Sequence, residues 1–308
     1  MSERPAIILD CDPGHDDALA LAVAARFTEL VGVTTVSGNV GIESTTRNAR
    51  VVLDLVAPEV DVHRGAARPL IVEPFFAEYV HGESGLDGAD LPAPSRAPAS
   101  DDAVAYLIET CRRREGLWLV PTGPLTNIAL ALRQAPDLAE RIAGISLMGG
   151  GSFGNTTAAA EFNFFCDPHA AAIVMDYGGP LIMAGLDVTH RFQATPPRIE
   201  RLRALPGRVP QLFAELLTFF SGTYVSRHDV MGGAAMHDVC AVLAITHPEL
   251  FTADERHVAV ETDGAITRGM SLIDERRLID RPASNTRVLR TIDADAAFEL
   301  LVESMPTA

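Results

Sequence analysis

"AIILDCDPGHDDALALAVA", residues 6–24, joins an apolar run, a group of acidic residues and an Ala/Leu-rich run. The apolar run predicts a buried strand and the Ala/Leu-rich run predicts a helix. Pro13-Gly14 between them predicts a sharp turn. The stretch therefore predicts a strand-turn-helix unit whose turn carries four carboxylates, those of Asp10, Asp12, Asp16 and Asp17.

The rest of the chain continues this alternation of short apolar runs and helical patterns. Apolar runs predict strands at 30–38, 116–123, 142–151 and 180–189, and periodic runs predict helices at 44–57, 124–135 and 167–177. Strands that are apolar on both faces and alternate with helices are typical of a mostly parallel sheet covered on both sides. The fold class we predict is an α/β protein with an open, mostly parallel sheet.

The C-terminal third departs from this regular alternation. Its patterns predict a helical insertion at about 196–235, a helix at 237–247, an antiparallel hairpin at 257–274 and a last helix at 293–305. Asp263-Gly264 is the expected hairpin turn. We expect one α/β domain over residues 1–308, with ligands beyond the carboxyl ends of its strands.

Composition limits the partners. The formal net charge of −16 disfavours nucleic acid and anionic membranes, and suits small neutral or cationic ligands and metal ions. The four cysteines form no CxxC pair, which is typical of reduced thiols in a cytosolic protein. No signal peptide and no apolar run of roughly 20 residues is visible, so we expect a cytoplasmic protein.

The acidic turn is the strongest chemical signal. One aspartate could merely cap the following helix. Four carboxylates at a strand end repel one another and need a cation or shared protons to be tolerated. Oxygen ligands of this kind suit Ca²⁺ or Mg²⁺, so the turn predicts a site for a hard cation.

Other strand ends carry weaker signals. The break at Thr122-Gly123-Pro124 leaves the Thr122 carbonyl without a ladder partner, and the glycines at 149–151 let backbone approach a ligand closely. Asn155, Glu161 and Asn163 supply the donors and acceptors that hydroxyl groups need, although a polar loop would look the same.

Two histidines complete these signals. His237-Asp238 begins an apolar helix, which Asp238 could merely cap. His81 lies in the Gly/Ser-rich segment "YVHGESGLDG" and is weak evidence alone. The joint placement of these groups after predicted strands gives them their weight.

Together these segments resemble a known family. "DCDPGHDDALAL", "VPTGPLTNIALAL", "LMGGG", "AEFN" and "MHDVCAV", in this order, resemble the calcium-dependent nucleoside hydrolases, also called inosine/uridine-preferring nucleoside N-ribohydrolases. The resemblance runs from Ile7 to at least the segment 268–271. It implies hydrolysis of the N-glycosidic bond of ribonucleosides to ribose and free base, in a homodimer or homotetramer.

The resemblance also implies roles for individual residues. It assigns Ca²⁺ to Asp12, Asp17, Asp238 and the Thr122 carbonyl, and makes Asp12 the base that takes a proton from a metal-bound water. His237 would be the acid that assists the leaving base. The remaining implied substrate contacts are Asp16, Asn39, His81, Met148, Asn155, Glu161, Phe162, Asn163 and Tyr224. Asp10 has no direct role in this scheme and is expected to support its neighbours.

Base preference is less definite. His81 and His237 are typical of the branch that accepts purines and pyrimidines, and a pyrimidine-preferring enzyme is the alternative. The purine-specific branch stacks the base on tryptophans, whereas Trp118 lies inside a predicted strand. Arg227 and His228 lie where the family's base-contacting helix runs, but their roles are open.

Two other classes compete with the hydrolase. A phosphatase of the haloacid dehalogenase type also has Asp-x-Asp after its first strand and would use Asp10 as nucleophile. It requires a lysine, and the sequence contains none. A non-catalytic nucleoside-binding protein is disfavoured because every proposed catalytic group is present.

Overall fold

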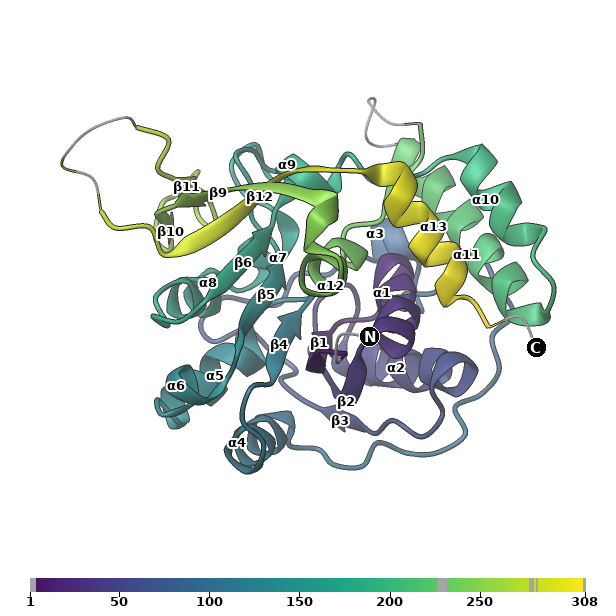
Figure 1. Ribbon diagram of the computed structural model, residues 1–308, viewed down its shortest axis with the longest axis horizontal. Helices are drawn as coiled ribbons and strands as arrows, with labels where there is room; N and C mark the ends of the chain where they lie inside the picture. Colours follow the sequence, from purple (N-terminus) through teal and green to yellow (C-terminus); the bar gives the residue numbers. More distant parts are fainter. Residues whose placement is uncertain (1–3, 227–231, 277–279, 281, 307–308) are drawn as a thin grey trace.

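The computed structural model describes residues 4–226, 232–276, 280 and 282–306. Its centre is an eight-stranded sheet of order β3-β2-β1-β4-β5-β6-β12-β9 (Figure 1). The strands are β1 (Ala6–Cys11), β2 (Glu29–Thr35), β3 (Val62–Arg64), β4 (Trp118–Pro121), β5 (Gly144–Met148), β6 (Leu181–Ala184), β9 (Phe251–Arg256) and β12 (Thr286–Ile292). All neighbours pair in parallel except β12 and β9, which confirms the predicted α/β class.

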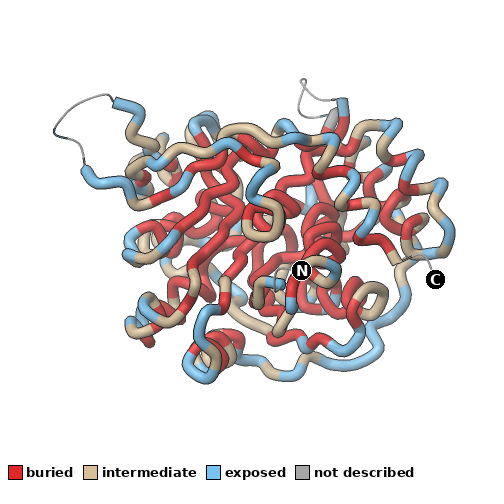
Figure 2. The backbone as a smooth tube through the Cα atoms, viewed as in Figure 1, coloured by how far each residue is buried: buried red, intermediate tan, exposed pale blue. Residues whose placement is uncertain are grey.

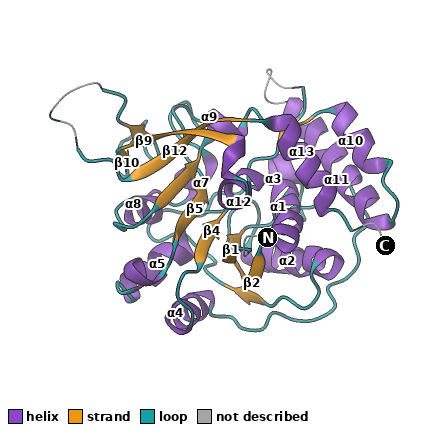
Figure 3. Cartoon of the chain, viewed as in Figure 1, coloured by secondary structure: helices purple, strands orange, loops and turns teal. Residues whose placement is uncertain are grey.

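Helices cover both faces of this sheet (Figure 3). The helices among the described residues are α1 (His15–Phe27), α2 (Ile42–Val56), α3 (Glu78–His81), α4 (Ala103–Arg113), α5 (Thr126–Gln134), α6 (Leu138–Arg141), α7 (Phe162–Cys166), α8 (Pro168–Met175), α9 (Leu186–Thr189), α10 (Pro196–Arg203), α11 (Arg208–Val225), α12 (Val239–Thr246) and α13 (Ala294–Ser304), with a 3₁₀ turn at Pro248–Leu250.

The sheet separates two apolar cores, and β1 shows how. Ile7 and Leu9 pack with α1, α12 and α13, while Ile8 between them packs with α4, α5 and α8. Alternate side chains of a strand point to opposite faces, so an apolar run is buried on both sides. Figure 2 shows the resulting continuous buried interior.

The order of the sheet also fixes where a ligand can bind. From β1 the chain moves outward through β2 and β3, then returns to the other side of β1 to form β4. The strand order therefore reverses at β1, and the loops after β1 and β4 leave a crevice at their carboxyl ends. The acidic turn, residues 12–17, lies at this point.

The predicted helical insertion is present as α10 and α11, which pack against each other. A short antiparallel pair, β7 (Gln193–Ala194) with β8 (Ala234–Ala235), joins the two ends of this segment. Arg227 and His228 lie outside the described residues. None of the described helices is long and apolar enough to cross a membrane. The predicted homo-oligomer and cytoplasmic location stay predictions.

The C-terminal hairpin is confirmed as β10 (Val258–Val260) with β11 (Ser271–Ile273). The tight turn predicted at Asp263-Gly264 is wrong, because residues 261–270 form a longer connection. Glu261 Oε1 accepts hydrogen bonds from the N–H groups of Asp263 and Gly264, and Gly269 supplies the positive φ of 82° near the end of the connection. The prediction also missed β9 and β12.

Candidate active site

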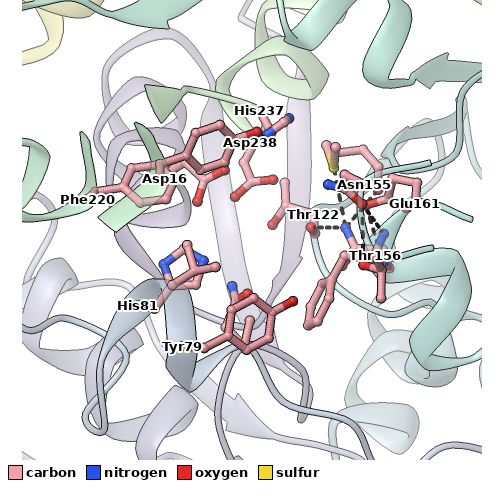
Figure 4. A pocket seen from close by; sticks show the side chains of 17 residues that line it. Asp16, Tyr79, His81, Thr122, Asn155, Thr156, Glu161, Phe220, His237 and Asp238 are labelled. Atoms are coloured by element: carbon pink, nitrogen blue, oxygen red, sulfur yellow. Dashed lines mark hydrogen bonds between the residues drawn. The ribbon is translucent and has the colours of Figure 1, made fainter. Parts of the chain in front are cut away.

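A cavity of about 560 Å³, including its open mouth, lies at the carboxyl ends of β1, β4 and β5 (Figure 4). Every predicted site residue except Asp12 and Asp17 lines it: Asp16, Asn39, His81, Thr122, Met148, Asn155, Glu161, Phe162, Asn163, Tyr224, His237 and Asp238. Asp12 and Asp17 are 1% and 0% exposed and lie next to it in the chain segment that carries Asp16. The fold therefore gathers residues from eight separate segments around one cavity.

Three carboxylates lie together at one end of the cavity, which we call the acidic end. Asp16, Asp17 and Asp238 each place an oxygen within 4.8 Å of the others, and all three are buried. Asp238 stands at the N-cap of α12, yet its side chain makes no capping hydrogen bond. The capping role considered for Asp238 is therefore absent, and its carboxylate lies close to those of Asp16 and Asp17. Figure 4 shows Asp238 on the side of Asp16.

This acidic triad has strongly perturbed ionisation. Burial, followed by the charge of Asp17, raises the pKa of Asp16 to about 8. Burial and then the charges of Asp16 and Asp17 raise the pKa of Asp238 well above its ordinary value. No cationic side chain among the described residues offsets these charges. A buried, all-oxygen donor set without a counter-ion fits a hard divalent cation.

Asp12 is held firmly beside this triad. Its Oδ2 accepts a 2.6 Å hydrogen bond from the Asn39 N–H, and Asn39 Nδ2 donates to the Asp12 carbonyl at 3.1 Å. A Cβ at Gly38 or Gly123 would lie 2.1 or 2.4 Å from the Asp12 carboxylate oxygens, so only glycine fits there. Burial, then the charge of Asp17, raises the Asp12 pKa well above its ordinary value. The hydrogen bonds from Asn39 and the close approach of Gly38 and Gly123 therefore hold this carboxylate in one orientation.

The geometry bears on the predicted ligand set. Asp17 and Asp238 are common to the predicted set and to the triad, whereas the triad contains Asp16 in place of Asp12. The Thr122 carbonyl accepts a 2.8 Å hydrogen bond from Asn163 Nδ2, and Thr122 Oγ1 donates to Asp17 Oδ1 at 2.8 Å. Thr122 therefore connects the acidic end to Asn163 on the wall formed by α7.

Asp10 lies apart from the cavity. Its Oδ1 accepts hydrogen bonds from Thr34 Oγ1 at 2.6 Å and Asn127 Nδ2 at 2.8 Å, and its Oδ2 is buried without a partner among the described residues. Burial raises its pKa to about 6. The Asp10 carbonyl accepts the Thr122 N–H at 2.8 Å. The two hydrogen bonds tie the Asp10 carboxylate to Thr34 and Asn127, neither of which lines the cavity, so Asp10 is not placed to act as the nucleophile of a phosphatase.

The wall formed by α7 and the glycine segment is polar. Glu161 caps α7: its carboxylate accepts hydrogen bonds from the N–H groups of Asn163, Phe164 and Gly150 at 2.9 to 3.1 Å. Burial nevertheless raises its pKa to about 7. Asn155 Oδ1 accepts the Phe162 N–H at 3.0 Å, which leaves its amide NH₂ available as a donor toward the cavity.

The wall across the cavity from α7 carries histidines and aromatic rings. His237 Nδ1 lies 2.8 Å from Thr189 Oγ1, and the Tyr224 hydroxyl lies 3.3 Å from His237 Nε2 and 3.4 Å from His190 Nε2. Burial, then the proximity of His15 and His237, lowers the pKa of His81 well below its ordinary value. The described residues that line this wall include no Asp, Glu or Arg, in contrast to the acidic end, and we call it the neutral wall.

Sequence reasoning missed several residues of this wall. Tyr79 and Phe220 line the cavity, and His190 and Thr189 contact Tyr224 and His237. They lie outside the motifs, so no local signal marked them. His15 was visible within the opening motif, but its contact with His81 joins positions 66 residues apart.

The fold is that of an α/β protein with a cavity at the carboxyl ends of its strands, and the buried acidic triad there could hold a hard divalent cation. The family model of the inosine-uridine preferring nucleoside hydrolases matches residues 7–299, and the chain belongs to this family. It is a ribonucleoside hydrolase, which cleaves the N-glycosidic bond.

Individual relatives refine this assignment. The chain is 44% identical over 305 residues to the pyrimidine-specific ribonucleoside hydrolase RihA of Klebsiella pneumoniae, covering 97% of both chains. It is 45% identical over 307 residues to RihA of a Shewanella species, covering 98% of this chain and 96% of the relative. The solved purine-preferring ribonucleoside hydrolase of Gardnerella vaginalis superposes with a TM-score of 0.91 at 33% identity, covering 97% of this chain and 98% of that one.

Proposed function

We propose that this enzyme hydrolyses pyrimidine ribonucleosides to ribose and the free base, with Ca²⁺ as its cation. The observation that carries the base preference is the 44–45% identity, over nearly full length, to relatives named pyrimidine-specific. This favours the pyrimidine-preferring alternative over the non-specific branch that the histidines suggested.

The make-up of the cavity supports the same proposal. Trp118, the single tryptophan of the chain, lies in β4 and not among the lining residues, so no tryptophan is available to stack a purine. His81, Tyr224 and His237 supply polar atoms beside the aromatic ring of Phe220 instead. A pyrimidine presents hydrogen-bonding groups on a smaller ring than a purine, which suits the polar atoms of these three side chains.

The acidic end suits a ribose that becomes positive. Breaking the N-glycosidic bond builds oxocarbenium character on the sugar. Buried carboxylates stabilise such charge strongly, because water is largely excluded from them. Asp16 lines the cavity at this end and accepts a hydrogen bond from a ribose hydroxyl in our proposal.

The donor set favours a cation of the calcium type. Asp17 and Asp238, with Asp12 or Asp16 and the Thr122 carbonyl, would hold it through oxygen atoms alone. When bound, the cation supplies Lewis acidity that lowers the pKa of a coordinated water. Asp12 then accepts the proton of the attacking water, in an orientation fixed by the Asn39 N–H.

The leaving base needs a proton or a hydrogen-bond donor. His237 is the residue proposed for this task, and Thr189 Oγ1 at 2.8 Å from Nδ1 orients its ring. Tyr224 lies within reach of His237 Nε2 and can exchange a proton with it. Asn155 and Glu161, on the far wall, are proposed to hold the 5′-hydroxyl end of the sugar.

A substrate panel tests the proposal. The kcat/KM values of the calcium-loaded enzyme for uridine and cytidine should exceed those for inosine and adenosine by at least about tenfold, with ribose and free base as products. A purine nucleoside hydrolysed best would overturn the base preference. If the chelated enzyme releases uracil equally fast with and without added Ca²⁺, the cation assignment is overturned.

A further inference from the structure

His15 and His81 form a buried pair at the neutral wall of the cavity. His15 is the first residue of α1 and is 1% exposed, whereas His81 ends α3 and lines the cavity. Their Nδ1 atoms lie 3.0 Å apart and their rings stack at 5.2 Å. Figure 4 shows His81 on the side of Phe220 and Asp16, across from Thr122 and Glu161.

The outer nitrogen of His15 fixes its own tautomer. His15 Nε2 lies 2.8 Å from the backbone carbonyl oxygen of Asp87. A carbonyl oxygen can only accept a hydrogen bond, so His15 Nε2 carries the hydrogen. The ring packs against Phe219 and Phe220 at centroid distances of 5.5 and 5.2 Å, and this apolar setting favours the neutral form. His15 Nδ1 therefore carries a lone pair and can only accept a hydrogen bond.

The tautomer of His15 in turn determines that of His81. A hydrogen bond between the two Nδ1 atoms requires the hydrogen on His81 Nδ1, because His15 Nδ1 has none. The alternative has His81 Nδ1 accepting the His15 backbone N–H at 3.3 Å, which would set two lone pairs against each other at 3.0 Å. The first arrangement keeps the shorter contact, at 3.0 Å, at the cost of the 3.3 Å bond from the His15 backbone N–H, and it leaves His81 Nε2 without a hydrogen.

His81 Nε2 is also open toward the substrate. It makes no hydrogen bond to any of the described residues. It is also not one of the fully buried polar atoms without a partner, so it is partly exposed. The ring cannot move away from His15 easily, because Phe220 stacks on it at 5.1 Å and Gly14 leaves just enough room beneath it. A Cβ at Gly14 would lie 2.7 Å from His81 Nδ1.

We propose that His15 is a positioning residue that fixes His81 as a hydrogen-bond acceptor, so that its Nε2 binds an N–H on the edge of the nucleobase. This inference rests on the proposed function, since the ligand at this wall is taken to be a nucleoside base. The preferred base then carries a ring N–H, as uracil does at N3. His81 recognises the base through this hydrogen bond, while His237 remains the group that assists the departure of the base.

A purely structural role for His15 predicts different behaviour, and two matched variants separate the roles. His15→Gln can place a donor near the position of Nε2 and keep the link to Asp87, but it has no acceptor near Nδ1. His15→Asn can place an acceptor near Nδ1 but does not reach Asp87. If His15 only anchors the Asp87 segment, Gln rescues and Asn does not; our proposal expects the reverse.

The tautomer can be measured without turnover. Ring nitrogens of ¹⁵N-histidine-labelled protein, free of substrate, report by NMR which nitrogen of each ring carries hydrogen, and loss of one signal set in His81→Phe assigns His81. We expect Nδ1–H on His81 in the parent protein and in His15→Asn, and Nε2–H in His15→Gln. Nε2–H on His81 in the parent protein overturns the proposal, and that spectrum decides even if a variant fails to fold.

Kinetics test the consequence for the base. Methylation of N3 removes the donor, so kcat/KM for 3-methyluridine should fall about tenfold or more below that for uridine. This ratio should persist in His15→Asn and shrink several-fold in His15→Gln. An unchanged ratio in His15→Gln overturns the proposal. Absence of uridine hydrolysis in the parent enzyme would refute the proposed function instead, and the NMR result would still stand or fall separately.

Discussion

The two ends of the cavity differ in charge and in the elements that build them. The acidic end is built from the turn after β1, the end of β4 and the start of α12, where Asp12, Asp17 and Asp238 are all buried. The neutral end is built from α3, α9 and α11, with His81, Tyr224 and Phe220 along it. The acidic end is therefore attached directly to the central strands, whereas the neutral end lies on segments outside the sheet.

This difference matches the two chemical demands of the reaction. The sugar develops positive charge, which buried carboxylates stabilise, and the base departs with negative charge, which neutral donors and acceptors can tolerate. Proton acceptance belongs at one end and base recognition at the other. Variants at the two ends should therefore fail in different ways.

The largest effect is expected for Asp12→Asn, which keeps shape but removes the proton acceptor at the acidic end. kcat for uridine should fall by about 10³-fold or more, because a positioned general base alone contributes roughly 10²–10⁴. The loss should be similar for an activated substrate such as nitrophenyl riboside, since water attack is needed for both.

Asp10→Asn is the matched control for that variant. Asp10 lies two residues before Asp12 in β1 and is equally buried, but its Oδ1 contacts Thr34 and Asn127, neither of which lines the cavity. We expect a loss at least about 100-fold smaller than for Asp12→Asn. Equal losses would mean that burial of charge, and not proton acceptance, explains the Asp12 effect.

His237→Ala probes the other end and should give a smaller, substrate-dependent loss. kcat for uridine should fall about 10²-fold, the usual contribution of a general acid. Nitrophenyl riboside, whose leaving group needs no proton, should lose less than about threefold. Comparable losses on both substrates would remove His237 from the leaving-group step and weaken the contrast between the two ends.

Removal of the cation should destabilise the protein in a pH-dependent way. Burial raises the pKa of Asp16 from 3.8 to about 8 and that of Asp10 from 3.8 to about 6. A carboxyl whose folded pKa is raised stabilises the fold fully below its unfolded pKa, and this contribution disappears as pH rises through the folded pKa. The chelated protein should therefore lose stability between about pH 4 and pH 8.

Calcium should reverse this loss, because it binds the ionised carboxylates. At about 100 times its Kd it should add about 3 kcal/mol at pH 8, and clearly less at pH 5 where protons compete. Thermal melts of chelated and calcium-loaded protein at both pH values measure the difference. Asp238→Asn should diminish the gain at pH 8, and an equal gain at both pH values would contradict the assignment of the triad as the cation site.

The acidic end could be predicted from the sequence because its signals are local. The four aspartates of the opening turn lie within eight residues, and strand ends of a parallel sheet meet at one edge. What the sequence left open was whether Asp238 caps α12 or faces the cavity, and the structure answers this because the carboxylate makes no capping bond. The division between Asp12 and Asp16 as ligands depends on side-chain geometry that no pattern encodes.

The contacts within the neutral end could not be predicted from the sequence, because they join distant segments. The hydrogen bond between His15 and His81 spans 66 positions, and that between Tyr224 and His190 spans 34.

The missed strands β9 and β12 have a related cause. Segments such as "FTADER" alternate polar and apolar residues weakly, because β9 lies at the edge of the sheet and most of its residues are not fully buried.

The smallest effect is expected for Tyr224→Phe, which removes one hydroxyl from the neutral end and keeps the ring. The hydroxyl lies 3.3 Å from His237 Nε2 and 3.4 Å from His190 Nε2, and burial raises its own pKa above the ordinary 10.0. Tyr224 therefore stays protonated throughout the working range and can share its proton with His237 or His190. If it assists His237, kcat for uridine should fall about three- to tenfold, KM should change little, and nitrophenyl riboside should be unaffected. A rise in KM alone would instead make Tyr224 a binding residue and leave His237 to act without it.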